Sequence, residues 1–214
     1  MFVRWSIVLT ALSAASAAAQ VPGAPVLQNA FHNPGLAFAA NFGSGTGQSF
    51  FGAAAAYGLG GRFQVTGAAG GQRSNGSSRG AYGIRAAAAL WSSSSGSLGA
   101  GAFAGVGGAP STRVNGVTTN TAVTSVPAGL TIGYRRPMGT TRGLSLYASP
   151  LYRWTRSDSA GTIVSNGSMR GAVGLDFAFT SSLGITLGGE FGGKTETTGT
   201  GLFGAAVSFV PGRR

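Results

Sequence analysis

The chain has 214 residues, a net charge of +11 and no cysteine. One all-β domain fits this length, whereas a disulfide framework and a thiolate metal site are excluded. Only 9% of the residues are charged and 10% are aromatic, a balance that argues against an intrinsically disordered chain. The basic residues are scattered along the sequence, and nucleic-acid binding normally needs a dense basic patch, so we expect no nucleic-acid partner.

Residues 1–19 have the organisation of a cleaved export signal. Arg4 supplies a basic start, a short apolar run follows, and Ala17 and Ala19 fit a signal-peptidase site. The apolar run is too short for a membrane anchor, which needs about 20 residues. We therefore expect cleavage after Ala19 and a mature chain that begins near Gln20.

Residues 20–35 contain three prolines and are expected to form an extended lead-in before the first strand, with one helical turn around Val26–Ala30. The single histidine of the chain, His32, lies in this segment. A lone histidine in such a position is most simply an incidental polar residue.

From Leu36 onward the sequence falls into about ten stretches of strand length. Bulky apolar residues alternate with small or polar ones in many of them, which is the side-chain period of a β-strand. Val173 and Leu175, for example, lie on the face opposite Arg170 and Asp176. The predicted strands are Leu36–Gly43, Phe50–Leu59, Arg62–Gly71, Tyr82–Trp91, Leu98–Gly107, Ala122–Arg135, Leu144–Arg156, Ser168–Thr180, Ile185–Gly193 and Gly201–Val210.

Two regularities favour a membrane barrel over a soluble sandwich. The connections after the second, fourth and eighth stretches are short, whereas those after the third, fifth and seventh are longer and polar, as in barrels with turns at one end and loops at the other. Aromatic residues also gather at strand ends, where an amphipathic ring suits the lipid headgroup boundary. Strict alternation points Trp91 inward. We predict an aromatic girdle that includes Tyr57, Tyr134, Phe179 and Phe209 at one rim and Trp154 at the other.

A closed barrel follows from the cost of exposing backbone groups to hydrocarbon, because only helices and closed barrels satisfy those groups internally. Ten tilted strands of about 9–11 residues match the thickness of a bilayer, and an even strand number returns both termini to one side. We predict an all-β, antiparallel, up-and-down transmembrane β-barrel over residues 36–214, with about ten strands and eight as the alternative number.

On these grounds the chain resembles the small bacterial outer-membrane β-barrel proteins. The resemblance covers residues 36–210 and includes the last stretch, GLFGAAVSFV. That stretch looks like the C-terminal strand which the barrel-assembly machinery recognises, with Phe209 in the aromatic position, although the chain continues as VPGRR. The resemblance implies a bacterial outer-membrane location among its lipids, a periplasmic position for residues 20–35, and a monomer. The extracellular connections carry Arg73, Arg79, Arg113 and Arg156, whose charge suits lipopolysaccharide phosphates, although solvated loops are the simpler interpretation.

Alternation places several ionisable side chains on the lumen face of this barrel. Buried charges must be paired, because an isolated one is very costly. A tight hairpin around Ser182 sets Glu190 level with Gly174, between the inward arginine and aspartate of the preceding strand. The predicted network contains Arg85, Arg135, Arg153, Arg170, Asp176, Glu190 and Lys194. It forms either a structural network that fills a closed barrel or a narrow pore that favours anions because arginine outnumbers acid.

We predict no catalytic, cofactor or metal site. The four acids of the mature chain are dispersed, whereas a Ca²⁺ site needs 6–8 oxygen ligands. Asp158 and Glu196 belong near the extracellular rim, and His32 belongs at the opposite end, so no hydrolase triad forms. We expect a non-enzymatic structural or surface protein, or a narrow pore. A secreted soluble β-sandwich adhesin is the alternative, and an outer-membrane hydrolase is less favoured.

Overall fold

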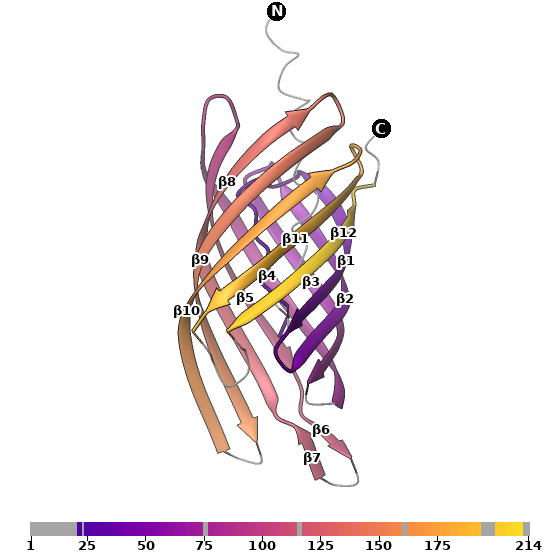
Figure 1. Ribbon diagram of the computed structural model, residues 1–214, viewed down its shortest axis with the longest axis vertical. Coiled ribbons are helices and arrows are strands. Elements are labelled where there is room, and N and C mark those ends of the chain that lie inside the picture. Colours follow the sequence, from indigo (N-terminus) through magenta and orange to yellow (C-terminus); the bar gives the residue numbers. More distant parts are fainter. Residues whose placement is uncertain are drawn as a thin grey trace, which may run out of the picture.

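The computed structural model describes residues 21–22, 24–74, 77–114, 117–159, 162–193 and 200–211. Ten antiparallel strands form one closed barrel (Figure 1). The barrel strands are β1 (Gly35–Gly45), β2 (Gln48–Leu59), β3 (Phe63–Ser74), β4 (Ser77–Ser92), β5 (Leu98–Ala109), β8 (Ala122–Met138), β9 (Arg142–Ser159), β10 (Thr162–Ala178), β11 (Leu183–Gly192) and β12 (Gly201–Phe209). Two short strands, β6 (Thr112–Val114) and β7 (Val117–Asn120), form a separate hairpin between β5 and β8.

The strand order confirms the predicted up-and-down barrel with ten strands, and eight is the wrong number. Each barrel strand pairs with its neighbours along the chain, β5 pairs with β8 around the small hairpin, and β1 closes the sheet against β12. The soluble β-sandwich alternative is wrong, because the strands form one closed sheet and not two stacked ones. Among the residues described, no helix is long and apolar enough to cross a bilayer.

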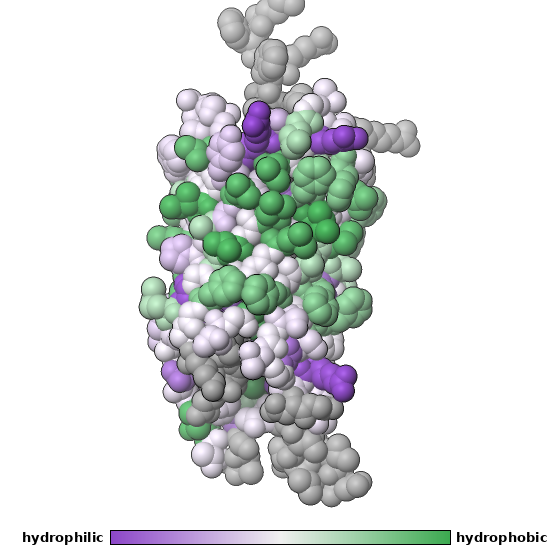
Figure 2. All heavy atoms as spheres, in the orientation of Figure 1, coloured by the Kyte–Doolittle hydropathy of each residue, from purple (hydrophilic) through white to green (hydrophobic). Residues whose placement is uncertain are grey.

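Burial follows the alternation of the sequence. On β9, the side chain of Arg153 is 1% exposed, whereas that of its neighbour Tyr152 is 48% exposed. The outward face carries most of the large apolar residues, and Figure 2 shows hydrophobic side chains gathered around the middle of the molecule between two more hydrophilic ends. Members of this apolar belt include Phe38, Phe51, Phe63, Ile84, Leu130, Ile132, Met169, Val173, Leu187, Phe203 and Val207.

The two ends of the barrel differ in their connections. One end, which we call the turn end, holds the short β2–β3, β4–β5, β8–β9 and β10–β11 turns. Gly60 and Gly61 have φ angles of 59° and 72° in the first of these turns, a conformation that glycine adopts freely. The opposite end, the loop end, holds the remaining connections and the β6–β7 hairpin (Figure 1).

The long polar connections at the loop end are largely paired strands, which differs from our expectation of loops. The β9–β10 pairing continues from Ala178–Gly143 to Thr162–Ser159, so most of SDSAGTIVSNG forms a projecting hairpin. Residues 162–167 are exposed on both faces of that hairpin. The β-branched and hydroxyl side chains of this stretch favour an extended chain, and antiparallel pairing satisfies its backbone groups.

The predicted girdle residues lie on the outer surface. Trp154 is half-buried there, toward the loop end. Trp91 differs from the alternation rule, because a register shift between Ala89 and Trp91 marks a β-bulge and the ring is 57% exposed. The exposed aromatic residues near the turn end are Tyr57, Tyr134, Phe179 and Phe209.

Candidate functional site

The segment before the first strand lies inside the barrel. We expected residues 20–35 to be a periplasmic lead-in with a helical turn at Val26–Ala30. The structure instead shows residues 24–34, which we call the strap, as an extended chain without a helix, and the side chains from Ala24 to Asn33 are buried. The lumen is therefore filled by a part of the chain that the strand pattern did not include.

Inward-facing glycines make room for the strap. A Cβ atom on Gly188 would lie 2.5 Å from Cδ2 of Leu27, and one on Gly99 would lie 2.7 Å from Cε1 of Phe31. Real Cβ atoms do not approach other atoms so closely, so a larger residue at either position would force the Leu27 or Phe31 side chain of the strap to move. Several glycines of the barrel wall thus allow the close approach of the strap.

Gly58 is the tightest of these positions, because a Cβ there would overlap the carbonyl oxygen of Asn33. We expect Gly58→Ala to lower the free energy of unfolding by about 1–3 kcal/mol, the usual cost of overpacking. The measurement is urea-induced unfolding of the refolded protein in detergent micelles. Gly67→Ala is the matched control, since a Cβ at Gly67 meets nothing within 4 Å. Equal losses for the two variants would contradict the proposed fit of the strap.

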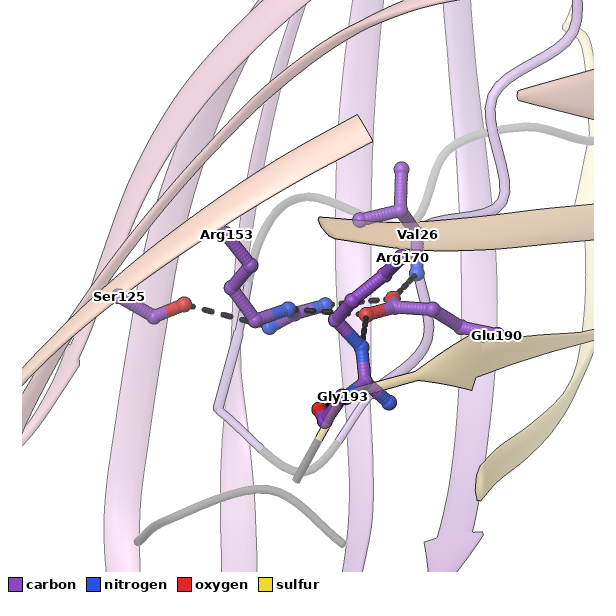
Figure 3. Close-up of polar contacts among 6 residues, drawn as sticks. All are labelled: Val26, Ser125, Arg153, Arg170, Glu190 and Gly193. Carbon is purple, nitrogen blue, oxygen red and sulfur yellow. Dashed lines mark hydrogen bonds and ion pairs between the residues drawn. The ribbon is translucent and has the colours of Figure 1, made fainter. Parts of the chain in front are cut away.

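Glu190 on β11 is the centre of the lumen charge network (Figure 3). Arg153 donates from Nε to Oε1 at 2.9 Å and from Nη2 to Oε2 at 2.5 Å. Arg170 donates from Nε to Oε1 at 2.6 Å, and the backbone N–H of Val26 donates to Oε2 at 2.8 Å. One buried carboxylate therefore joins β9, β10, β11 and the strap.

The register of the β10–β11 hairpin differs by one step from our expectation. Glu190 lies opposite Ala172 and not opposite Gly174, because the hairpin is centred on Ser181 instead of Ser182. The carboxylate still lies between the inward side chains of Arg170 and Asp176, as the alternation of both strands requires.

The remaining donors of the two arginines are directed to neighbouring polar groups. Nη1 of Arg153 donates to the Ser125 hydroxyl at 3.2 Å, and Nη1 of Arg170 donates to the Gly193 carbonyl at 2.5 Å. Figure 3 shows both guanidinium groups extending across the lumen toward the same carboxylate. The pairing compensates for the burial of these charges, which would otherwise be very unfavourable.

Asp176 forms a second polar cluster nearer the turn end. Its carboxylate accepts hydrogen bonds from Nδ2 of Asn29 at 2.5 Å and from the Thr186 hydroxyl at 2.7 Å. The same Asn29 amide donates to the Ser145 hydroxyl at 2.8 Å. The strap thus supplies one hydrogen-bond donor to each of the two buried acids.

Backbone and apolar contacts complete the seat of the strap. The hydroxyl groups of Thr131 and Ser149 donate to the carbonyl of Gln28 at 2.8 and 3.2 Å. Val26 packs in a buried cluster with Ala87, Phe103, Leu151 and Ala172. Side chains from β4, β5, β8, β9 and β10 therefore lie around the strap at this level.

The other predicted network members lie apart from Glu190. Arg85 is buried on β4, and Arg135 lies near the turn end, where its Nε donates to the Gly96 carbonyl at 2.6 Å and its guanidinium lies 4.4 Å from the centroid of the Phe31 ring. Lys194 lies outside the described residues. Among the residues described, no cluster of His, Asp and Glu could hold a metal ion.

Sequence reasoning missed the strap residues that complete both clusters. The available signal was composition: residues 24–34 carry no Asp, Glu, Lys or Arg, and they mix apolar with amide side chains, as a buried segment with satisfied polar groups does. His32 belongs to the same segment and is 5% exposed, so it is a buried residue and not an incidental surface one.

Comparison with known proteins gives fold likeness alone. No protein-family model matches the chain, and no curated protein matches it in sequence. The N-terminal β-barrel domain of Pseudomonas aeruginosa OprF is similar with a TM-score of 0.34 and 13% identity, over 81% of this chain and 95% of that one. The translocator domain of the autotransporter NalP from Neisseria meningitidis is similar with a TM-score of 0.41 and 15% identity, over 84% of this chain and 89% of that one. Likenesses of this size carry no argument about function.

Proposed function

We propose that this protein is a bacterial outer-membrane β-barrel with a non-enzymatic structural or surface role, and that its own strap closes the lumen. The outer surface supports the membrane location. Large apolar side chains cover that surface in a belt, and soluble monomers rarely expose apolar patches of such extent. A closed barrel also pairs the backbone N–H and C=O groups of every strand with a neighbouring strand. Such pairing is required in hydrocarbon, where no water can form hydrogen bonds with the backbone.

The filled lumen is the observation that carries the structural role. Arg153 and Arg170 both contact Glu190, and Val26 of the strap binds the same carboxylate. These guanidinium groups are held across the lumen against one carboxylate, so they occupy the space that a passing ion would need. Barrels near eight strands are normally filled by side chains, and this barrel of ten adds a chain segment to the filling.

Export, assembly and surroundings are part of the same proposal. Cleavage after Ala19 would leave a short N-terminus able to enter the lumen, where Val21 is wholly buried. β12 would be the strand that the barrel-assembly machinery recognises, with Phe209 exposed on the outer face at its end. Arg73 and Arg156 are exposed toward the loop end, where they would meet lipopolysaccharide phosphates. We propose a monomer.

Planar-bilayer recording tests the closed lumen. We expect the intact protein, refolded in detergent and added to a bilayer, to insert without a steady conductance, because the strap and the Glu190 cluster fill the interior. A general porin recorded in the same bilayer is the positive control, and flotation with liposomes verifies insertion. A steady open channel in the intact protein would contradict the structural role, and solubility without detergent would contradict the membrane location.

A narrow pore that favours anions is the second candidate function. The described lumen contains the side chains of Arg85, Arg135, Arg153 and Arg170 but only two acids, Asp176 and Glu190. If the strap leaves the barrel, this excess of arginine sets a positive lumen field. The strap then decides between the two functions.

A further inference from the structure

A pocket of about 440 Å³ opens at the turn end, outside the Glu190 and Asp176 clusters. It lies between the strap, the β2–β3 turn and the end of β4, with one side chain from β8. The residues that give the pocket its chemistry are Phe31, His32, Arg62, Trp91, Ser92 and Arg135. Neither proposed function uses this pocket.

The pocket is positively charged without a compensating acid. Two arginines, Arg62 and Arg135, line it, and no Asp or Glu is among its lining residues. Arg135 is held in place by its bond to the Gly96 carbonyl and by stacking on Phe31, so its guanidinium is pre-organised. Arg62 lies on the β2–β3 turn and is exposed, which lets it close over a ligand. Such a pair favours an anion with oxygen acceptors.

His32 adds a buried polar group to the wall of the pocket. Its Nε2 lies 3.3 Å from Nε2 of Gln28, and the imidazole also interacts with the backbone of Arg62 and Asn29. These contacts hold the ring in the wall of the pocket, next to the turn that carries Arg62.

The outer wall of the pocket reaches the apolar belt. Leu90 and Trp91 line it and are 64% and 57% exposed. The β-bulge at this point turns the indole outward, and bulges at barrel rims commonly re-aim a side chain for a function. An indole suits the level of lipid headgroups. A ligand with an anionic head and an acyl chain therefore fits both the interior and the outer edge of the pocket.

We propose that this pocket binds the phosphate of an anionic phospholipid in the leaflet at the turn end. Arg62 and Arg135 donate to the phosphate oxygens, and the acyl chain lies against Leu90 and Trp91. Free inorganic phosphate offers the same anionic oxygens to the two arginines. Only a lipid also places an acyl chain against the apolar side chains at the outer wall of the pocket. This assignment rests on the membrane location proposed for the barrel.

Native mass spectrometry of the detergent-refolded protein tests the assignment. We expect phosphatidylglycerol to be retained about tenfold more tightly than phosphatidylcholine, and Arg62→Gln to remove about tenfold of that affinity, the effect of one charge-assisted hydrogen bond. Arg142→Gln is the matched control, because Arg142 is an exposed arginine of the same rim that does not line the pocket. Trp91→Ala is expected to weaken retention of the lipid but not of inorganic phosphate.

Three results would overturn the assignment: equal retention of the two lipids, equal loss in Arg62→Gln and Arg142→Gln, or phosphate retained as tightly as phosphatidylglycerol with no effect of Trp91→Ala. The last result would assign the pocket to free phosphate. Liposome flotation of each variant is measured in parallel. If a variant floats normally with liposomes and any of these results is obtained, the lipid site is contradicted while the proposed membrane barrel is not.

Discussion

Glu190→Gln is expected to lower the free energy of unfolding by about 3–5 kcal/mol, the range for breaking a buried ion pair by removing one partner. The substitution keeps the size of the side chain but leaves Arg153 and Arg170 buried without their shared carboxylate. It also weakens the acceptor for the backbone N–H of Val26. Urea-induced unfolding in detergent micelles, followed by tryptophan fluorescence and by gel migration with and without heating, measures the loss.

Two further variants make this result specific. Arg142→Gln removes an exposed charge at the turn end and is expected to change the free energy of unfolding by less than about 0.5 kcal/mol. In the double variant Glu190→Gln with Arg170→Gln, one uncompensated charge is removed with its partner, so the combined loss is expected to be smaller than the sum of the two single losses. A loss below about 1 kcal/mol for Glu190→Gln would contradict a central role for this carboxylate.

A chain that begins at Asn33 is expected to change the barrel from closed to conducting. The truncation removes the strap residues that fill the lumen, including Val26, Gln28 and Asn29. A ten-stranded barrel is narrow, so we expect a small conductance. The inward arginines, which include Arg85, Arg135, Arg153 and Arg170, outnumber the two described inward acids, so the current is expected to favour anions. The reversal potential under a salt gradient in a planar bilayer measures the selectivity.

The controls separate an open lumen from a damaged barrel. Heat-dependent gel migration shows whether the truncated chain has refolded. Full-length Leu27→Ala keeps the strap and its polar contacts, so we expect it to stay closed. Arg153→Ala in the truncated chain is expected to reduce the preference for anions. A refolded truncated barrel that does not conduct would show that the strap is not the closing element, and a cation preference would contradict the assignment of the lumen charge.

Both experiments test the hydrogen bonds between the strap and the buried acids, one by changing an acid and the other by removing the strap. The strap pairs with Glu190 through Val26 and with Asp176 through Asn29, so its departure costs hydrogen bonds to both buried acids. Opening of the lumen is therefore coupled to the stability of the two clusters. We expect variants that remove the hydrogen bonds of the strap to Glu190 or Asp176 to shift the protein toward the conducting form.

The sequence by itself determined the barrel and the direction of its side chains. A strand has a side-chain period of two, so once a stretch alternates, each residue is assigned to the lumen or to the outside. This is why Arg153, Arg170 and Glu190 could be placed inward from their positions alone. Local rules reached their limit at Trp91, because a β-bulge changes the count of residues by one and leaves no mark in the alternation.

Only the tertiary structure decided that residues 24–34 lie inside the barrel. Their partners are far away in the chain: Val26 and Glu190 are 164 positions apart, and Asn29 and Asp176 are 147 positions apart. The lack of charged residues in this segment is typical of a buried chain, but an extended segment without a regular period does not indicate which residues it will contact. Inward glycines leave space for the segment, and the two buried acids require hydrogen-bond donors, which the segment supplies. Both conditions exist only after the sheet has closed into a barrel.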